Sequence, residues 1–315
     1  MRTQELTRAQ TARGAALVLA VAVAASVPIA IADADDSLRG GNASSKSTAS
    51  TAKVLKKKAH WSSNVAVGFG NGYFRFHSNG VPKQGVASEY AVPNPGVVVP
   101  NETNSHVAPS SDVVNRQAYD FKITTKPKKA NKVTSISTGP VGVMISGALV
   151  FNPYEGDGTT VAMASNFTLP DAQGHQVAFL DSCNGHPSPG PVYAYHYHGL
   201  PPCVTKRVDK KHGPSHIIGV AFDGFPIYGD RDIHGRKIKA AQLDRCNGIT
   251  SKTPEFRQGI YHYVLLNAPT KHSSMACLKG HVSSPDGAFP EASTRGRSVF
   301  LCGGPAEADQ PSRRH

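Results

Sequence analysis

Four short segments occur twice in this chain, in the same order, and this repeat limits the possible folds more than any single motif does. The first copy comprises 142–151, 181–185 (Asp-Ser-Cys-Asn-Gly), 195–197 (Tyr-His-Tyr) and Cys203; the second comprises 219–228, 244–248 (Asp-Arg-Cys-Asn-Gly), 261–263 (Tyr-His-Tyr) and Cys277. Such ordered recurrence predicts a duplicated β unit with halves at about 142–203 and 219–277. We expect a pseudo-two-fold axis that makes His196 and His262 equivalent and brings their loops together.

The pattern of apolar residues predicts strands along most of the chain. Apolar and polar residues alternate at 119–123, and a strand at 73–77 ends in an Asn79-Gly80 turn. Similar runs lie at 141–151, 176–180, 193–198, 217–228 and 261–266, whereas helical periodicity is found near 238–246. With 30 glycines, 23 prolines and 18% charged residues, the composition favours a turn-rich β protein over a helical bundle. We predict a mainly β fold, a single disulfide-stapled domain of sandwich or barrel type with little helix.

The N-terminus has the features of an export signal. Arg2, Arg8 and Arg13 precede an apolar run at 14–31, and 30–32 (Ala-Ile-Ala) offers a cleavage site between small residues. We predict a signal peptide over 1–32, no transmembrane anchor after cleavage, and a secreted or periplasmic location. The rest of the chain is predicted as a flexible linker over 33–60, a β domain over 61–302 and a disordered tail over 303–315.

The charge of the chain indicates the kind of partner to expect. The net charge is +12, and removal of residues 1–32 takes away three arginines and one glutamate and leaves +10. Excess positive charge favours contact with anionic surfaces, so we expect the cell envelope as a partner. Nucleic acid is not expected, because the basic residues are dispersed and the protein is predicted to be exported.

All five cysteines follow residue 180, and export would place them in an oxidising compartment. The repeat suggests one bridge in each half, Cys183–Cys203 and Cys246–Cys277, each closing a loop of roughly 20–30 residues. Spacing alone does not determine connectivity, so this pairing depends on the repeat. Cys302 is then left as a free thiol or an intermolecular partner.

The run 195–198 (Tyr-His-Tyr-His) has the strongest chemical character in the chain. Side chains alternate on a strand, so His196 and His198 share one face and can present imidazoles to one metal ion. Further candidate ligands are His186, His216 and His262, with Asp223 as a ligand or as the acceptor of an imidazole N–H. Imidazole suits copper, zinc and iron, and copper is favoured because it binds such sites most tightly among divalent ions.

Three functions are compatible with these patterns. The first is an exported metal-binding protein of the cell envelope, with copper favoured and a redox role in view. The second is an envelope-bound structural or binding module without metal, in which histidines beside tyrosines serve packing and Asp223 belongs to a turn. The third is a hydrolase in which His196 or His198 acts as general base, oriented by Asp223 or Asp181.

Together these segments resemble the YHYH-domain family, which is named for its Tyr-His-Tyr-His run. The resemblance covers about residues 70–281 and rests on 78–82, 181–186, 195–198, 222–229, 243–248, 261–263 and 277–280. It implies an exported domain of the same type and carries no assignment of catalytic residues. Lys83 and Gln84 follow the Asn79-Gly80 turn, where the family leads us to expect a histidine.

Overall fold

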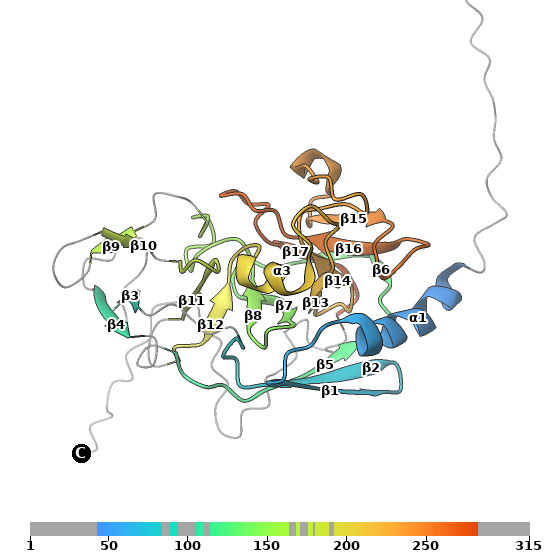
Figure 1. Cartoon of the computed structure of the whole chain (residues 1–315), viewed down its shortest axis with the longest axis horizontal. Helices are drawn as coiled ribbons and strands as arrows, with labels where there is room; N and C mark the ends of the chain where they lie inside the picture. Colours follow the sequence, from blue (N-terminus) through green and yellow to red (C-terminus); the bar gives the residue numbers. More distant parts are fainter. Residues whose placement is uncertain are drawn as a thin grey trace, which may run out of the picture. The chain divides into compact units, whose positions relative to one another are not determined.

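The computed structural model describes residues 43–83, 89–93, 105–109, 114–163, 168–170, 176–178, 180–188 and 192–282, and strands predominate among them (Figure 1). The helical segments of this part of the chain are α1 (Ala43–Lys58), α3 (Pro202–Val208) and the 3₁₀ turn η1 (Ala240–Gln242). The predicted mainly β class is therefore confirmed.

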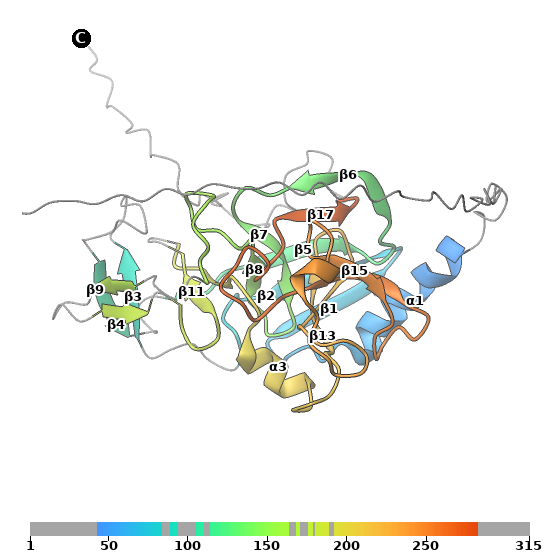
Figure 2. The ribbon, with the colours of Figure 1, turned by 90° about the horizontal axis from the view of Figure 1, so that it is seen from above.

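An eight-stranded sheet contains the glycine-valine and Tyr-His-Tyr strands of both copies of the repeat. Its strands are, in spatial order, β11 (Gly185–Pro187), β12 (Tyr195–Tyr197), β8 (Leu149–Phe151), β7 (Pro140–Met144), β13 (Ile217–Ala221), β14 (Pro226–Tyr228), β16 (Ile260–Val264) and β15 (Gly248–Ser251). A three-stranded sheet has the order β1 (Val65–Gly70), β2 (Tyr73–Ser78), β5 (Tyr119–Thr124). Three two-stranded pairs are β6 (Lys129–Ser135) with β17 (Cys277–Gly280), β3 (Glu89–Pro93) with β4 (Ser105–Pro109), and β9 (Thr168–Pro170) with β10 (Gln176–Ala178). Figure 2 shows β6 beside β17.

The three-stranded and eight-stranded sheets share one hydrophobic core. The alternation predicted at 119–123 places Tyr119, Phe121 and Ile123 of β5 inside. The ring of Phe121 lies 5.2 Å from that of Phe222, which follows β13 of the larger sheet. Face-to-face contact of two sheets through their apolar sides corresponds to sandwich-type packing.

The Gly-Val segments of the two copies meet in the middle of the large sheet. Gly142 of β7 pairs with Ala221 of β13, and Gly219 of β13 pairs with Met144 of β7. A Cβ atom on Gly142 would lie 2.6 Å from the carbonyl oxygen of Val220, and a Cβ atom on Gly219 would lie equally close to that of Val143. Glycine is therefore required at both positions by the close approach of the neighbouring backbone.

The strand pairing follows the same pattern from each end of this sheet. On one side β11–β12 is antiparallel, β12–β8 parallel and β8–β7 antiparallel. On the other side β15–β16 is antiparallel, β16–β14 parallel and β14–β13 antiparallel. This correspondence supports the predicted internal duplication, which itself stays a prediction.

Part of the segment expected to be a flexible linker is helical instead. Residues Ala43–Lys58 form α1, in which the Leu55 side chain is fully buried in the core. The Trp61 indole donates a hydrogen bond to the Leu55 carbonyl, 3.0 Å away. Near 238–246, where helical periodicity was noted, the structure has only η1, and α3 was not expected.

Several predicted features lie outside the described residues. These are the signal peptide at 1–32, the tail at 303–315 and Cys302. Within the described ranges, no helix has the length and apolar character needed to cross a membrane.

Candidate metal centre

Three buried histidines meet at one end of the large sheet. His186 of β11 lies opposite His196 of β12 in the antiparallel pair, and His198 follows β12 by one residue. One ring nitrogen from each histidine lies within 4.8 Å of the other two. His196 and His198 are therefore on one face, as their spacing predicts, and strand pairing adds His186 to them.

Backbone carbonyls determine which nitrogen of each imidazole faces its neighbour. The Nδ1 atom of His196 donates to the carbonyl of Ala194, and that of His198 donates to the carbonyl of Asn152, both at 2.9 Å. Because a carbonyl only accepts, both protons are assigned to Nδ1 and both Nε2 atoms carry lone pairs. These two Nε2 atoms face each other at 3.1 Å.

The surroundings keep these histidines neutral. Burial lowers the pKa of His186 and of His196 well below the usual value, and charge on the neighbouring imidazoles lowers both pKa values further. Burial likewise lowers the pKa of His198, to about 4. At neutral pH the cluster therefore presents unprotonated nitrogens to a common point, which is the state in which imidazole binds metal ions.

Phe151 and Glu155, which the sequence reasoning did not select, complete the surroundings. The ring of Phe151 at the end of β8 stacks on His196 with centroids 3.8 Å apart. The Oε1 atom of Glu155 lies 3.9 Å from Nε2 of His198, and Glu155 is buried. Burial, and secondarily Asp157, raises the pKa of Glu155 to about 8. No spacing signal pointed to Glu155, because the parallel pairing of β8 with β12 brings it here.

A disulfide and an aspartate hold the loop that leads into β11. Cys183 pairs with Cys203, as predicted, and this bridge encloses all three histidines. Oδ1 of Asp181 accepts the amide N–H groups of Cys183 and Gly185, at 2.8 and 3.0 Å. Its Oδ2 accepts the hydroxyl of Tyr195 on β12, at 2.7 Å. The aspartate therefore links the two strands that carry the cluster.

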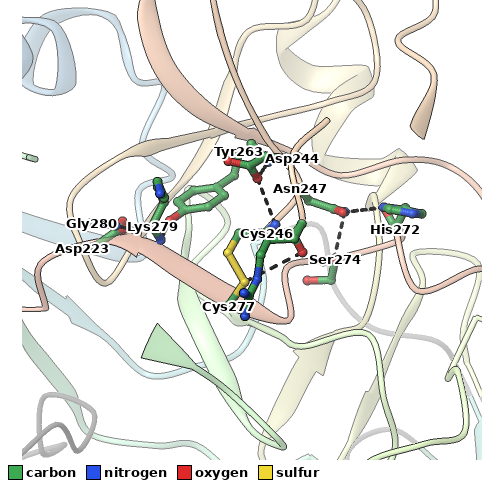
Figure 3. The surroundings of a disulfide bond; sticks show 12 residues. Asp223, Asp244, Cys246, Asn247, Tyr263, His272, Ser274, Cys277, Lys279 and Gly280 are labelled. Atoms are coloured by element: carbon green, nitrogen blue, oxygen red, sulfur yellow. Dashed lines mark hydrogen bonds between the residues drawn. A yellow bond between two sulfur atoms is a disulfide. The ribbon is translucent and has the colours of Figure 1, made fainter. Parts of the chain in front are cut away.

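The second half has the same loop without the histidine cluster. Cys246 pairs with Cys277, as predicted, and Asp244 accepts the amide of Cys246 at 2.9 Å (Figure 3). The amide of Gly248 donates to the same carboxylate, also at 2.9 Å. The hydroxyl of Tyr261 donates to the same carboxylate at 2.9 Å.

The structure does not bring His262 to the other histidines, contrary to the expectation from the pseudo-two-fold axis. His262 lies on β16, and four strands separate β16 from β12 in the sheet. Its Nδ1 atom donates to the carbonyl of Ile260 at 3.0 Å, and burial lowers its pKa to about 4. Val264 occupies the position that corresponds to His198, so the second strand offers one imidazole instead of two.

His216 and Asp223 also lie outside the cluster. The Nδ1 atom of His216 donates to Glu255 at 2.6 Å, and this hydrogen bond raises the pKa of His216. Asp223 is buried and accepts the Tyr263 hydroxyl at 2.5 Å and the Gly280 amide at 2.7 Å (Figure 3). Burial raises the pKa of Asp223 to about 6. The hydrolase hypothesis needs Asp223 or Asp181 to orient an imidazole, whereas carbonyl groups hold Nδ1 of both His196 and His198.

Comparison with known protein families gives one match. The sequence model of the family described as YHYH protein matches residues 120–236 and 232–280, about half of the chain. The chain belongs to the YHYH family. The YHYH match includes every strand of the eight-stranded sheet, and the Tyr-His-Tyr-His run supplies two of the three clustered histidines. No curated protein and no solved structure matches the chain.

Proposed function

We propose that this YHYH protein binds one transition metal ion at His186, His196 and His198. The observation that carries the proposal is the 3.1 Å separation between the Nε2 atoms of His196 and His198 while both Nδ1 atoms donate elsewhere. Two lone pairs held this close repel each other, and a cation between them removes the repulsion. The low pKa values of both imidazoles disfavour a proton in that role.

The spacing of the nitrogens also suits a metal ion. Two nitrogens that each lie about 2.0–2.1 Å from one ion are separated by roughly 2.9–3.4 Å for ligand angles between about 90° and 110°. The Nε2 separation of 3.1 Å falls inside this range. Hydrogen bonds from Nδ1 to carbonyl groups are the usual means of orienting imidazole ligands.

Copper is the favoured ion for this proposal, with zinc and iron as the alternatives that imidazole also accommodates. We further propose that the protein acts outside the cytoplasm. The two disulfide pairs and the YHYH family support this location. A metal acquired there would serve storage or, for copper, redox chemistry.

An anionic surface of the cell envelope is the partner that the charge supports. Lys128 and Lys129 line a hollow of about 370 Å³ together with Thr250 and Tyr261. Lys132 lines a second hollow, on β6. Salt-sensitive binding to anionic vesicles or wall polymers would support this contact, and binding unaffected by salt would oppose it.

The test of the metal site compares two equivalent histidines. His196 and His262 are 3% and 2% exposed, and each donates from Nδ1 to the carbonyl two residues earlier. We would reconstitute the wild type, His196→Ala and His262→Ala with copper or zinc, remove excess ion by gel filtration, and measure metal per chain. We expect about one ion in the wild type and in His262→Ala, and a loss of most of it in His196→Ala.

Two outcomes would overturn the proposal. A wild-type chain without metal after reconstitution would exclude the site, and the envelope-bound module without metal would then become the leading function. Equal loss in both variants, with circular dichroism showing intact folds, would mean that the clustered histidines are not the ligands.

A further inference from the structure

Glu155 has a buried carboxyl oxygen that lacks a hydrogen-bond partner among the described residues. It follows β8 in the loop that the isolated bridge of Tyr154 with Val161 closes, and its backbone amide donates to the Thr160 carbonyl at 2.9 Å. The residue is 5% exposed, and no described residue donates a hydrogen bond to its Oε1 atom. A buried carboxylate oxygen without a donor is costly, so a partner for it is expected.

The histidine cluster lies beside this oxygen. Oε1 of Glu155 lies 3.9 Å from Nε2 of His198, which is too far for a hydrogen bond. Two ligands of one ion lie roughly 2.9–3.4 Å apart, so the Glu155 side chain would move slightly toward His198 on binding. Nε2 of His198 directs a lone pair toward Glu155, and the ionised form of the Glu155 side chain would face it as a second acceptor. A cation between them would satisfy both atoms.

One short segment holds both sides of the His198 ring. The carbonyl of Asn152 accepts from Nδ1, and the side chain of Glu155, three residues later, lies opposite Nε2. Phe151, immediately before, stacks on His196. The segment 151–155 therefore contacts two of the imidazoles and places a carboxyl group beside His198.

We propose that Glu155 is the fourth ligand of the metal centre, so that three imidazoles and one carboxylate surround a single divalent ion. This inference rests on the proposed metal site. Four protein ligands that are all buried fill a tetrahedral coordination sphere, which is typical of sites that retain an ion for structure or storage. A hard carboxylate ligand also favours Zn²⁺ or Cu²⁺ over Cu⁺, so it opposes redox cycling through Cu⁺.

The experiment compares Glu155→Gln with Glu255→Gln. Glu255 is a matched control, because it is also buried and its carboxylate binds His216 and Tyr228 instead of the cluster. Zn²⁺ affinity would be measured by competition with a chelator, Cu⁺ affinity in the same way under reducing conditions, and ligand geometry from the visible spectrum of the Co²⁺-loaded protein.

We expect Glu155→Gln to weaken Zn²⁺ binding by about 10–100-fold or more, to change the Co²⁺ spectrum, and to leave Cu⁺ affinity within about threefold. Glu255→Gln should leave all three unchanged. Unchanged Zn²⁺ affinity and Co²⁺ spectrum in Glu155→Gln would overturn the inference while the three-histidine site stands. A wild type without metal would overturn the site as well.

A second measurement reports the ligands of the ion directly. X-ray absorption of the Zn²⁺-loaded wild-type protein counts imidazole ligands through their multiple scattering. A spectrum that fits three imidazoles and one oxygen ligand in the wild type, and that loses the oxygen in Glu155→Gln, would support the inference. Four imidazoles would refute it.

Discussion

The two disulfides allow stability and metal binding to be separated experimentally. They close loops of similar length, but only Cys183–Cys203 encloses His186, His196 and His198. The perturbation is removal of one bridge at a time, as Cys183→Ala/Cys203→Ala or Cys246→Ala/Cys277→Ala. Both would be made in a Cys302→Ser background, so that the fifth cysteine cannot exchange with the others.

The loop lengths predict similar losses of stability. The sequence separations are 20 and 31 residues, which correspond to about 3.3 and about 3.7 kcal/mol in the chain-entropy description of a disulfide. Urea unfolding of the metal-free proteins would measure both values. A difference of more than about 2 kcal/mol between the two variants would contradict this entropic reasoning.

The metal affinities should differ, because the two bridges relate differently to the cluster. Among the described residues, β11 is an edge strand of three residues whose sheet neighbour is β12, and the bridge at Cys183 ties its entry to the segment after His198. The second bridge reaches the cluster less directly: Ser273, four residues before Cys277, donates a hydrogen bond to the main-chain carbonyl of His198. We expect the first variant to lose about tenfold or more in Zn²⁺ affinity and the second less than about threefold. Equal losses would refute the assignment of the site to the first half.

Three further predictions concern the fold. Burial raises the pKa of the Asp223 carboxyl group to about 6, above an unfolded value near 3.8, so the folded state binds a proton at Asp223 more tightly than the unfolded state does. The free energy of unfolding should therefore rise by up to about 3 kcal/mol as pH falls from 6 to 4. Urea unfolding between pH 4 and 7 should show this contribution in the wild type and not in Asp223→Asn, and parallel curves would contradict it. Gly142→Ala should destabilise the fold by about 1–3 kcal/mol through overpacking. Gly68→Ala is the control, because a Cβ atom there meets nothing within 4 Å, and it should leave the stability unchanged. Thermal unfolding would compare the two variants. Leu55→Ala should cost about 2–5 kcal/mol in chemical denaturation, and the absence of any loss would restore the linker interpretation of α1.

Local patterns of apolar residues predicted the strands of the core. The alternation at 119–123 corresponds to β5, which buries one face, and the apolar runs at 141–151 and 217–228 correspond to β7, β8, β13 and β14, which are buried on both faces. Period-two alternation reports burial directly, so it survives into the structure. The helix α1 escaped prediction because its sequence is polar and small, and its place in the core depends on the burial of Leu55.

The candidate site was partly visible in the residues. The period of a strand places His196 and His198 on one face, a relation that acts between near neighbours in the chain. The recurrence of the Asp-x-Cys-Asn-Gly segment, followed in each copy by a later cysteine, predicted both bridges. Strand pairing then determined the composition of the cluster. The register of β11 with β12 adds His186, the parallel pairing of β12 with β8 adds Glu155, and the central β7–β13 pair directs the two Tyr-His-Tyr strands toward opposite ends of the sheet. His262 therefore lies outside the cluster. Short-range patterns could not predict this, because packing between segments far apart in the chain determines which strands are neighbours in a sheet.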